Sequence, residues 1–134
     1  MSGERLLLDT TYVAALHNSR DQFHQIAKSL FARVKAASQI WITEAILIEI
    51  GNALSRTNRS AADQFIQSCY GTSNFIVVLI KRGLQLYAER QDKDWGLTDC
   101  ISFVVMRDNN LHDAVTADQH FQQAGFRALL SRVN

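Results

Sequence analysis

Short apolar runs that alternate with amphipathic stretches constrain the fold of this chain more than any other feature of its sequence. Residues 5–8 end in three leucines and are too few for a helix, which is typical of a buried central strand. Residues 20–37 instead repeat apolar side chains at helical spacing, beginning with Phe23, Ile26 and Ala27. Strands separated by helices predict a parallel sheet with helices on both faces.

The expected elements fit a three-layer α/β/α sandwich with a short, mainly parallel sheet of four or five strands. Expected strands cover residues 5–8, 40–42, 74–79, 114–116 and 126–130. Expected helices cover residues 10–16, 20–37, 44–56, 60–70, 81–90, 98–108 and 118–124. Hydroxyl side chains are expected to cap several of these helices: Ser19, Thr43, Ser60 and Thr98.

Length and composition are ordinary for a soluble globular protein. The 134 residues predict one domain spanning 1–134, and the net charge of +1 gives no bulk signal for nucleic acid or membrane. We see no signal peptide and no apolar stretch near the ~18 residues of a membrane helix, so we expect a cytoplasmic protein with no membrane partner. Cys69 and Cys100 lie in apolar helical patterns and are expected to be reduced core residues.

Carboxylates stand where apolar segments end or helices begin: Asp9, Glu49, Asp99 and Asp118. The carboxyl ends of parallel strands share one edge of a sheet, and α/β folds bind their ligands at that edge. Carboxylates gathered there would repel one another unless a hard divalent cation held them together. Oxygen ligands suit Mg²⁺ or Mn²⁺, and such an ion can activate water for in-line attack on a phosphate.

Each of these carboxylates also has a structural explanation. Asp9 and Asp118 precede helices, where Asp is a common cap, and Asp99 lies in a first helical turn, which favours an anion. Glu49 lies on an apolar run at 45–54 but could belong to a polar stripe that faces water. Capping explains each Asp taken alone, whereas three such Asp together with Glu49 are hard to attribute to capping.

Other polar residues give weaker signals. Thr98 and Thr116 stand beside two of the carboxylates and could orient them, although cap and strand roles are the simpler interpretation. The histidines lack close metal-ligand pairing and are interpreted as surface or core-edge groups: His17, His24, His112 and His120. No glycine-rich phosphate loop is present, which excludes a P-loop hydrolase. Basic residues that could line the path of a phosphate backbone, or simply face solvent, are Arg20, Arg56, Arg59, Lys81, Arg82 and Lys93.

Segments along essentially the whole chain resemble, in order, the PIN domain and within it the VapC-like toxin ribonucleases. They are LLLDTTYVAAL, DQFHQIA, ITEAILIEIGNAL, DKDWGLTDCISFVVM and TADQHFQQAGF. The resemblance makes Asp9, Glu49, Asp99 and Asp118 the family's acidic residues and His24 a structural residue. It implies a metal-dependent endoribonuclease that dimerises and, for toxin members, is inhibited by an antitoxin.

The leading hypothesis is therefore a Mg²⁺- or Mn²⁺-dependent ribonuclease, the toxin of a type II toxin–antitoxin pair. Asp9 and Asp99 would be the principal metal ligands, and Asp118 would complete the site directly or through water. Glu49 would position a water or bind a second ion. A phosphoryl-transfer enzyme with Asp9 as nucleophile fits less well, because Thr11 stands where a haloacid-dehalogenase-like site needs a second Asp. A non-catalytic PIN-like module that binds RNA or protein remains the alternative.

Overall fold

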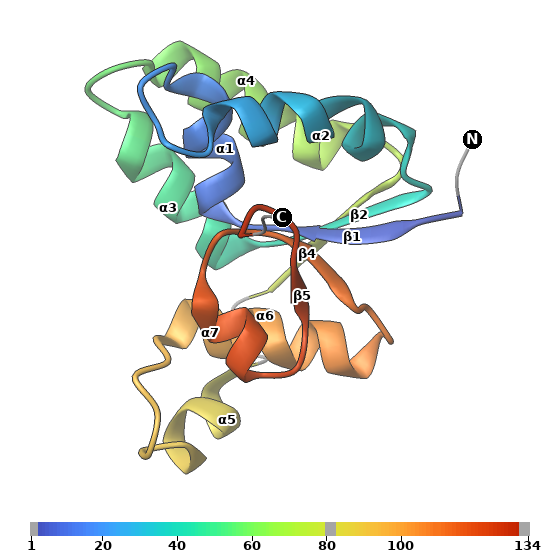
Figure 1. Cartoon of the computed structure of the whole chain (residues 1–134), viewed down its shortest axis with the longest axis vertical. Helices are drawn as coiled ribbons and strands as arrows, with labels where there is room; N and C mark the ends of the chain where they lie inside the picture. Colours follow the sequence, from blue (N-terminus) through green and yellow to red (C-terminus); the bar gives the residue numbers. More distant parts are fainter. Residues whose placement is uncertain (1–2, 80–82, 132–134) are drawn as a thin grey trace.

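A parallel sheet forms the centre of the protein in the computed structural model, which describes residues 3–79 and 83–131 (Figure 1). Its strands are β1 (Arg5–Leu8), β2 (Gln39–Thr43), β3 (Phe75–Val78), β4 (Asp113–Val115) and β5 (Arg127–Ala128). Their order across the sheet is β3-β2-β1-β4-β5, and every neighbouring pair runs parallel. The predicted parallel sheet is thus confirmed.

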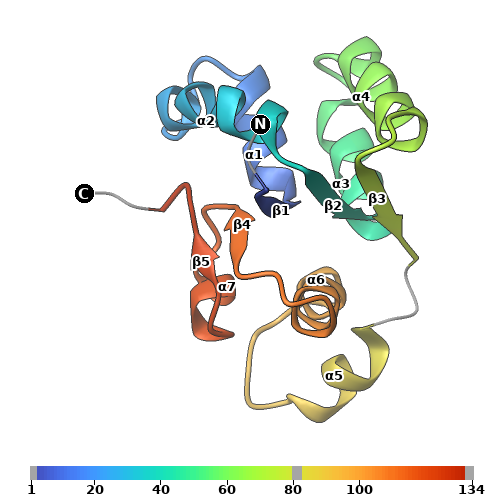
Figure 2. The same cartoon turned by 90° about the vertical axis from the view of Figure 1, so that its right-hand side faces the viewer.

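Helices cover both faces of this sheet. They are α1 (Thr10–His17), α2 (His24–Ala36), α3 (Glu44–Leu54), α4 (Arg59–Gly71), α5 (Leu84–Glu89), α6 (Leu97–Asp108) and α7 (Gln119–Gln123). Figures 1 and 2 show α1 to α4 on one face and α5 to α7 on the other. The α/β/α sandwich predicted from the sequence is confirmed.

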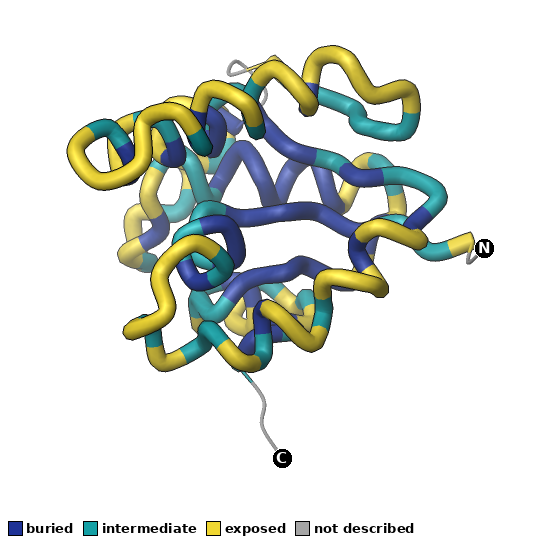
Figure 3. Tube along the Cα trace, turned by 90° about the horizontal axis from the view of Figure 1, so that it is seen from above, coloured by how far each residue is buried: buried dark blue, intermediate teal, exposed yellow. Residues whose placement is uncertain are grey.

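The core lies along the central strands and the middle of α6. Leu6, Leu7 and Leu8 expose at most 1% of their surface, because β1 has a strand on each side and helices on both faces. Burial of each leucine side chain contributes about 1.5–3 kcal/mol. Figure 3 shows buried segments running through the centre and exposed segments around the rim. Cys69 and Cys100 are both free and buried, as expected.

Helix starts differ from the predictions more than the elements themselves do. The Thr43 hydroxyl caps α3 as expected, accepting a hydrogen bond from the Ile46 N–H at 3.2 Å. The other predicted caps are wrong. The helix predicted at 20–37 begins only at His24, and α4 is capped by Asn58 rather than Ser60. The α6 helix begins after Gly96, which places Thr98 inside its first turn.

Gly83, at the start of α5, permits a close approach to the backbone of α6. A Cβ at this position would lie 2.3 Å from the Ile101 backbone nitrogen, so any other residue would force the two segments apart. The helix predicted at 81–90 begins at Leu84, and residues 81–82 lie outside the described residues. Over the part of the chain that is described, no helix is long and apolar enough to cross a membrane.

Candidate functional site

The strand order reverses between β1 and β4, and this reversal locates the candidate site. The chain passes from β1 to β2 and β3 on one side, then returns to β4 and β5 on the other. Open parallel sheets bind ligands beside the carboxyl ends of the strands at such a reversal. Asp9 directly follows β1, and Asp118 follows β4 by three residues. The Asp9 N–H donates to the carbonyl of Val115 at 3.4 Å, which joins the two strand ends.

Three helices begin at this edge, and each carries one of the predicted Asp residues at its start. Asp118 caps α7, with its Oδ1 accepting a hydrogen bond from the His120 N–H at 2.8 Å. Asp99 accepts one from the Gly96 N–H at 3.2 Å at the start of α6. Asp9 precedes α1 but its side chain does not cap that helix. Helix capping therefore explains some of the hydrogen bonds of Asp99 and Asp118, but it does not explain the position of the Asp9 side chain.

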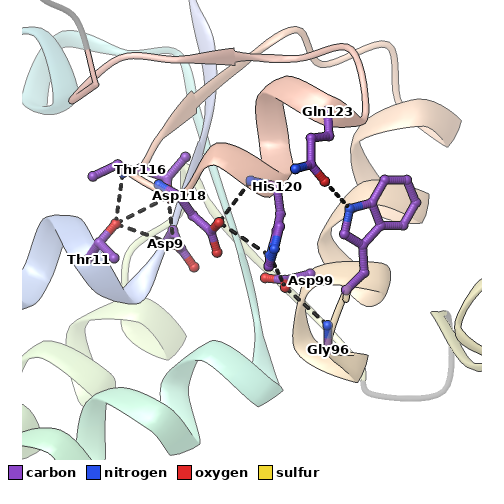
Figure 4. Close-up of polar contacts among 10 residues, drawn as sticks. Asp9, Thr11, Gly96, Asp99, Thr116, Asp118, His120 and Gln123 are labelled. Carbon is purple, nitrogen blue, oxygen red and sulfur yellow. Dashed lines mark hydrogen bonds and ion pairs between the residues drawn. The ribbon is translucent and has the colours of Figure 1, made fainter. Parts of the chain in front are cut away.

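Asp9 is a buried carboxylate held by two threonine hydroxyls. Thr116 donates to Asp9 Oδ2 at 2.7 Å and Thr11 donates to the same oxygen at 3.3 Å (Figure 4). Only 6% of Asp9 is exposed, and this burial raises its pKa from 3.8 to about 6 against the lowering effect of the hydrogen bonds. The charges of Asp99 and Glu49 raise the pKa further. Asp9 thus carries a charge that the protein fold alone does not compensate.

Thr116 and Thr11 also tie Asp9 to the loop that carries Asp118. The Ala117 N–H donates to the Thr11 hydroxyl at 3.1 Å, and the Asp118 N–H donates to the Thr116 hydroxyl at 3.0 Å. The sequence favoured a strand role for Thr116, but its hydroxyl orients the buried carboxylate. The two Asp residues are consequently fixed relative to each other by one hydrogen-bond network.

Asp99, Asp118 and His120 form the tightest group of potential ligands among the described residues. One ligand atom from each lies within 4.8 Å of the others. His120 Nδ1 is 3.2 Å from Asp99 Oδ2 and 3.4 Å from Asp118 Oδ1 (Figure 4). Burial raises the pKa of Asp99, and the neighbouring charge of Asp118 raises it further. These side chains could hold a cation directly.

Glu49 lies at the rim of the site on the side of α3. Its Oε1 accepts a hydrogen bond from the Thr10 hydroxyl at 2.6 Å, and the Glu49 side chain is exposed. Its charge nevertheless reaches Asp9, whose pKa it raises. Glu49 therefore belongs to the same electrostatic cluster as Asp9, although both lie outside the close group of Asp99, Asp118 and His120.

His120 is the residue that the sequence interpretation missed. The sequence alone indicates a surface or core-edge group, because no second histidine stands at metal-ligand spacing. The available signal was its position two residues after Asp118 at a helix start, since a capping Asp binds the N–H of that residue. The resulting donor set of carboxylate oxygens and one imidazole nitrogen fits a divalent cation.

Comparison with known proteins agrees with this fold. The family model of the PIN domain matches residues 6–127, so the chain belongs to the PIN domain family. Mycobacterium tuberculosis VapC20, described as a toxin that cleaves the sarcin–ricin loop, has a similar structure with a TM-score of 0.75 and 23% identity. That comparison covers 90% of this chain and 95% of VapC20.

A second solved structure shares the fold at greater distance. FitAcB from Neisseria gonorrhoeae has a TM-score of 0.55 and 13% identity, covering 92% of this chain and 94% of that one. A search of curated proteins by sequence found no match. The resemblance of the chain to the PIN domain is therefore confirmed by the family match, and its VapC-like architecture by the similarity to VapC20.

Proposed function

We propose that this protein is a divalent-metal-dependent endoribonuclease and the toxin of a type II toxin–antitoxin pair. The observation that carries the proposal is Asp9, a buried carboxylate at the strand reversal with its pKa raised to about 6 and two further Asp residues nearby. Burying such charge costs stability unless a cation balances it in the working state. Membership of the PIN domain family and the similarity to a toxin, VapC20, support the same activity.

Asp9, Asp99 and Asp118 would hold Mg²⁺ or Mn²⁺, as the sequence predicted, with Glu49 as an outer carboxylate. When bound, such an ion supplies an acidified water and offsets charge on the scissile phosphate. Thr116 and Thr11 keep Asp9 oriented, and Asp9 is ionised above a pH of about 6.

Glu49 can position a water at the rim of the site. Its Oε1 is held by the Thr10 hydroxyl, while its other carboxylate oxygen is a further acceptor on the same group. A second ion at this carboxylate would be the two-metal form of the same chemistry.

RNA is the proposed substrate. The loop that precedes Asp99 carries a basic residue, Lys93, that could contact the phosphate backbone of the RNA. Lys93 lies six residues before Asp99, with its ammonium 5.9 Å from the Trp95 ring centroid. Trp95 is itself fixed to α7 by the hydrogen bond from its Nε1 to Gln123 Oε1 at 3.1 Å. We propose that Lys93, on the loop that leads to Asp99, meets a phosphate of the RNA backbone.

We also propose a homodimer that forms through the β3 side of the sheet. Large exposed apolar residues lie on α3, α4 and α5 and directly after β3: Ile48, Tyr70, Leu84, Tyr87 and Leu79. Figure 2 shows these elements on the β3 side of the sheet. The β3 strand is the edge strand there, and exposed edges next to apolar patches favour association. Light scattering at micromolar concentration should give twice the monomer mass, and a monomer would reject the dimer.

A cognate antitoxin and a cytoplasmic location complete the proposal. Both follow from the toxin assignment, and a neighbouring gene for a small DNA-binding protein would identify the antitoxin. Co-expression of that protein should silence cleavage by the purified complex.

The alternative is a PIN-like module that binds RNA or protein without cleaving it. A cleavage assay on purified protein separates the two, using structured RNA with Mn²⁺, Mg²⁺ or chelator. We expect internal cleavage only with metal, and its loss in Asp99→Asn. The matched control is Asp63→Asn, which neutralises an exposed carboxylate on α4. Binding of RNA without cleavage under every metal condition would favour the module.

A further inference from the structure

The arrangement of His120 in the carboxylate group resembles that of a metal ligand. Its Nδ1 faces Asp99 Oδ2 at 3.2 Å and Asp118 Oδ1 at 3.4 Å. Adjacent ligands of an octahedral ion with bonds of about 2.1 Å are separated by about 3 Å. His120 Nδ1 therefore already lies at nearly the spacing from each carboxylate oxygen that a shared ion requires, and all three donor atoms lie within 4.8 Å of one another.

The position of His120 is fixed by the helix that carries it. Its backbone N–H is bound by Asp118 Oδ1, and its carbonyl accepts from the Ala124 N–H at 3.0 Å. The next residue, Phe121, is fully buried and packs edge-on against Phe103 with ring centroids 4.9 Å apart. A ligand held on such an anchored turn loses little conformational freedom when it binds an ion.

We propose that His120 is a direct nitrogen ligand and that it makes this centre select a first-row transition ion, with Mn²⁺ as the test ion, over Mg²⁺. The inference rests on the proposed metal-dependent function and assigns the ligand set of that same site. Mg²⁺ takes oxygen ligands and dehydrates reluctantly, whereas first-row transition ions accept imidazole as well as carboxylate. A site built from carboxylates alone would lack this discrimination.

A purely structural role for His120 makes the opposite prediction. If the ring only bridges Asp99 and Asp118 by hydrogen bonds, an arriving ion has to displace it. Removing the ring would then strengthen binding of Mn²⁺ and Mg²⁺ alike. The sign of the change in affinity therefore separates a ligand from a competitor.

Calorimetric titration of metal-free protein with Mn²⁺ and with Mg²⁺ measures that sign. We expect His120→Ala to weaken Mn²⁺ binding about tenfold or more while changing Mg²⁺ binding less than about threefold. His112→Ala is the matched control, because His112 is exposed and precedes β4 at the opposite edge of the sheet. Equal weakening for both ions, or tighter binding of both, overturns the proposal.

Pulsed electron paramagnetic resonance of Mn²⁺ on the wild-type protein tests the ligand without any variant. A ¹⁴N coupling should be present and should change to a ¹⁵N coupling when only the histidines carry ¹⁵N. His120→Ala should lose the coupling, whereas His112→Ala should keep it. Metal-dependent RNA cleavage with no nitrogen coupling would leave the proposed function standing and reject this inference. A nitrogen coupling in a protein that does not cleave RNA would support His120 as a ligand and reject the proposed ribonuclease function.

Discussion

Carboxylates lie at both ends of the strands, which we call the amino edge and the carboxyl edge of the sheet. Their negative charges are compensated in different ways at the two edges. At the amino edge, Arg33 donates from Nε to Glu4 Oε1 at 2.9 Å and from Nη2 to Asp113 Oδ2 at 3.4 Å. Arg127 donates to the other oxygen of Asp113. At the carboxyl edge, the hydrogen-bond donors to Asp9 Oδ2 are threonine hydroxyls.

The pKa values follow this difference in partners. The hydrogen bond from Arg33 lowers the pKa of Glu4, whereas burial raises the pKa of Asp9 to about 6. Arginines stabilise the charged carboxylates at the amino edge. At the carboxyl edge, the buried Asp9 is held by hydroxyl groups and has no cationic hydrogen-bond partner. Perturbed carboxylates of the second kind mark functional sites, because stability alone would not retain them.

The largest expected effect is the loss of RNA cleavage when a carboxylate of the carboxyl edge is neutralised. Asp9→Asn and Asp99→Asn each keep the side-chain shape but remove one negative charge from the proposed metal site. We expect RNA cleavage to fall about 10²- to 10³-fold in each, or about 3–4 kcal/mol in activation free energy. Single-turnover cleavage with Mn²⁺ measures this loss. Asp113→Asn should retain near wild-type cleavage per folded molecule, and an equal loss there would contradict the distinction between the edges.

The pH dependence of stability should be the next largest effect. Because the native pKa of Asp9 is raised from 3.8 to about 6, the folded state binds the extra proton between these values. Its contribution to stability is full below pH 3.8 and is lost as the pH rises through about 6. The loss is about 3 kcal/mol at about 1.4 kcal/mol per pKa unit.

Urea unfolding in chelator at pH 4 and pH 7 measures this contribution. The wild-type protein should lose about 2–2.5 kcal/mol more between these pH values than Asp9→Asn does. If the unfolding free energies of the two proteins change with pH in parallel, the pKa of Asp9 is not raised in the folded state.

Metal should stabilise the protein through the carboxyl edge. An ion that binds only the native state adds about 2.7 kcal/mol to the unfolding free energy at one hundred times its Kd. A thermal scan should therefore show a rise in Tm with millimolar Mn²⁺ in the wild type and in Asp113→Asn. The rise should be much smaller in Asp99→Asn, and an undiminished rise would place the ion elsewhere.

The smallest effect should come from the arginines of the amino edge. Arg33 is half exposed, so Arg33→Gln should cost only about 1 kcal/mol of unfolding free energy and leave cleavage unchanged. Lys28→Gln, on the same helix and exposed, is the matched control. Chemical unfolding of both variants at pH 7 tests the difference, and a loss of cleavage in Arg33→Gln would link the two edges.

Local sequence was sufficient for the strands and for the carboxylates that follow them. The three leucines of β1 require burial on both faces, which leads directly to a central parallel strand and to Asp9 at its end. Helix starts were less predictable, because several polar residues compete for each cap and tertiary contacts decide between them. Asn58 therefore caps α4 although Ser60 also fits the pattern.

The partners of the site residues depend on contacts that sequence spacing does not contain. Thr116 bonds Asp9 across 107 positions, and His120 meets Asp99 across 21. Both contacts exist only because β4 pairs with β1 and α7 packs beside α6. The sequence therefore predicted the acidic residues, while the hydroxyl and imidazole groups around them required the fold.

The most direct test of the two-edge account is the unfolding free energy of Asp9→Asn beside that of Asp113→Asn, measured in chelator at pH 7. Asp9→Asn removes a buried charge without a cationic partner, so its stability should equal or exceed that of the wild type. Asp113→Asn weakens the hold of two arginines on a buried carboxylate and should lose about 1–3 kcal/mol. A clear loss of stability in Asp9→Asn, comparable to that in Asp113→Asn, would contradict the account.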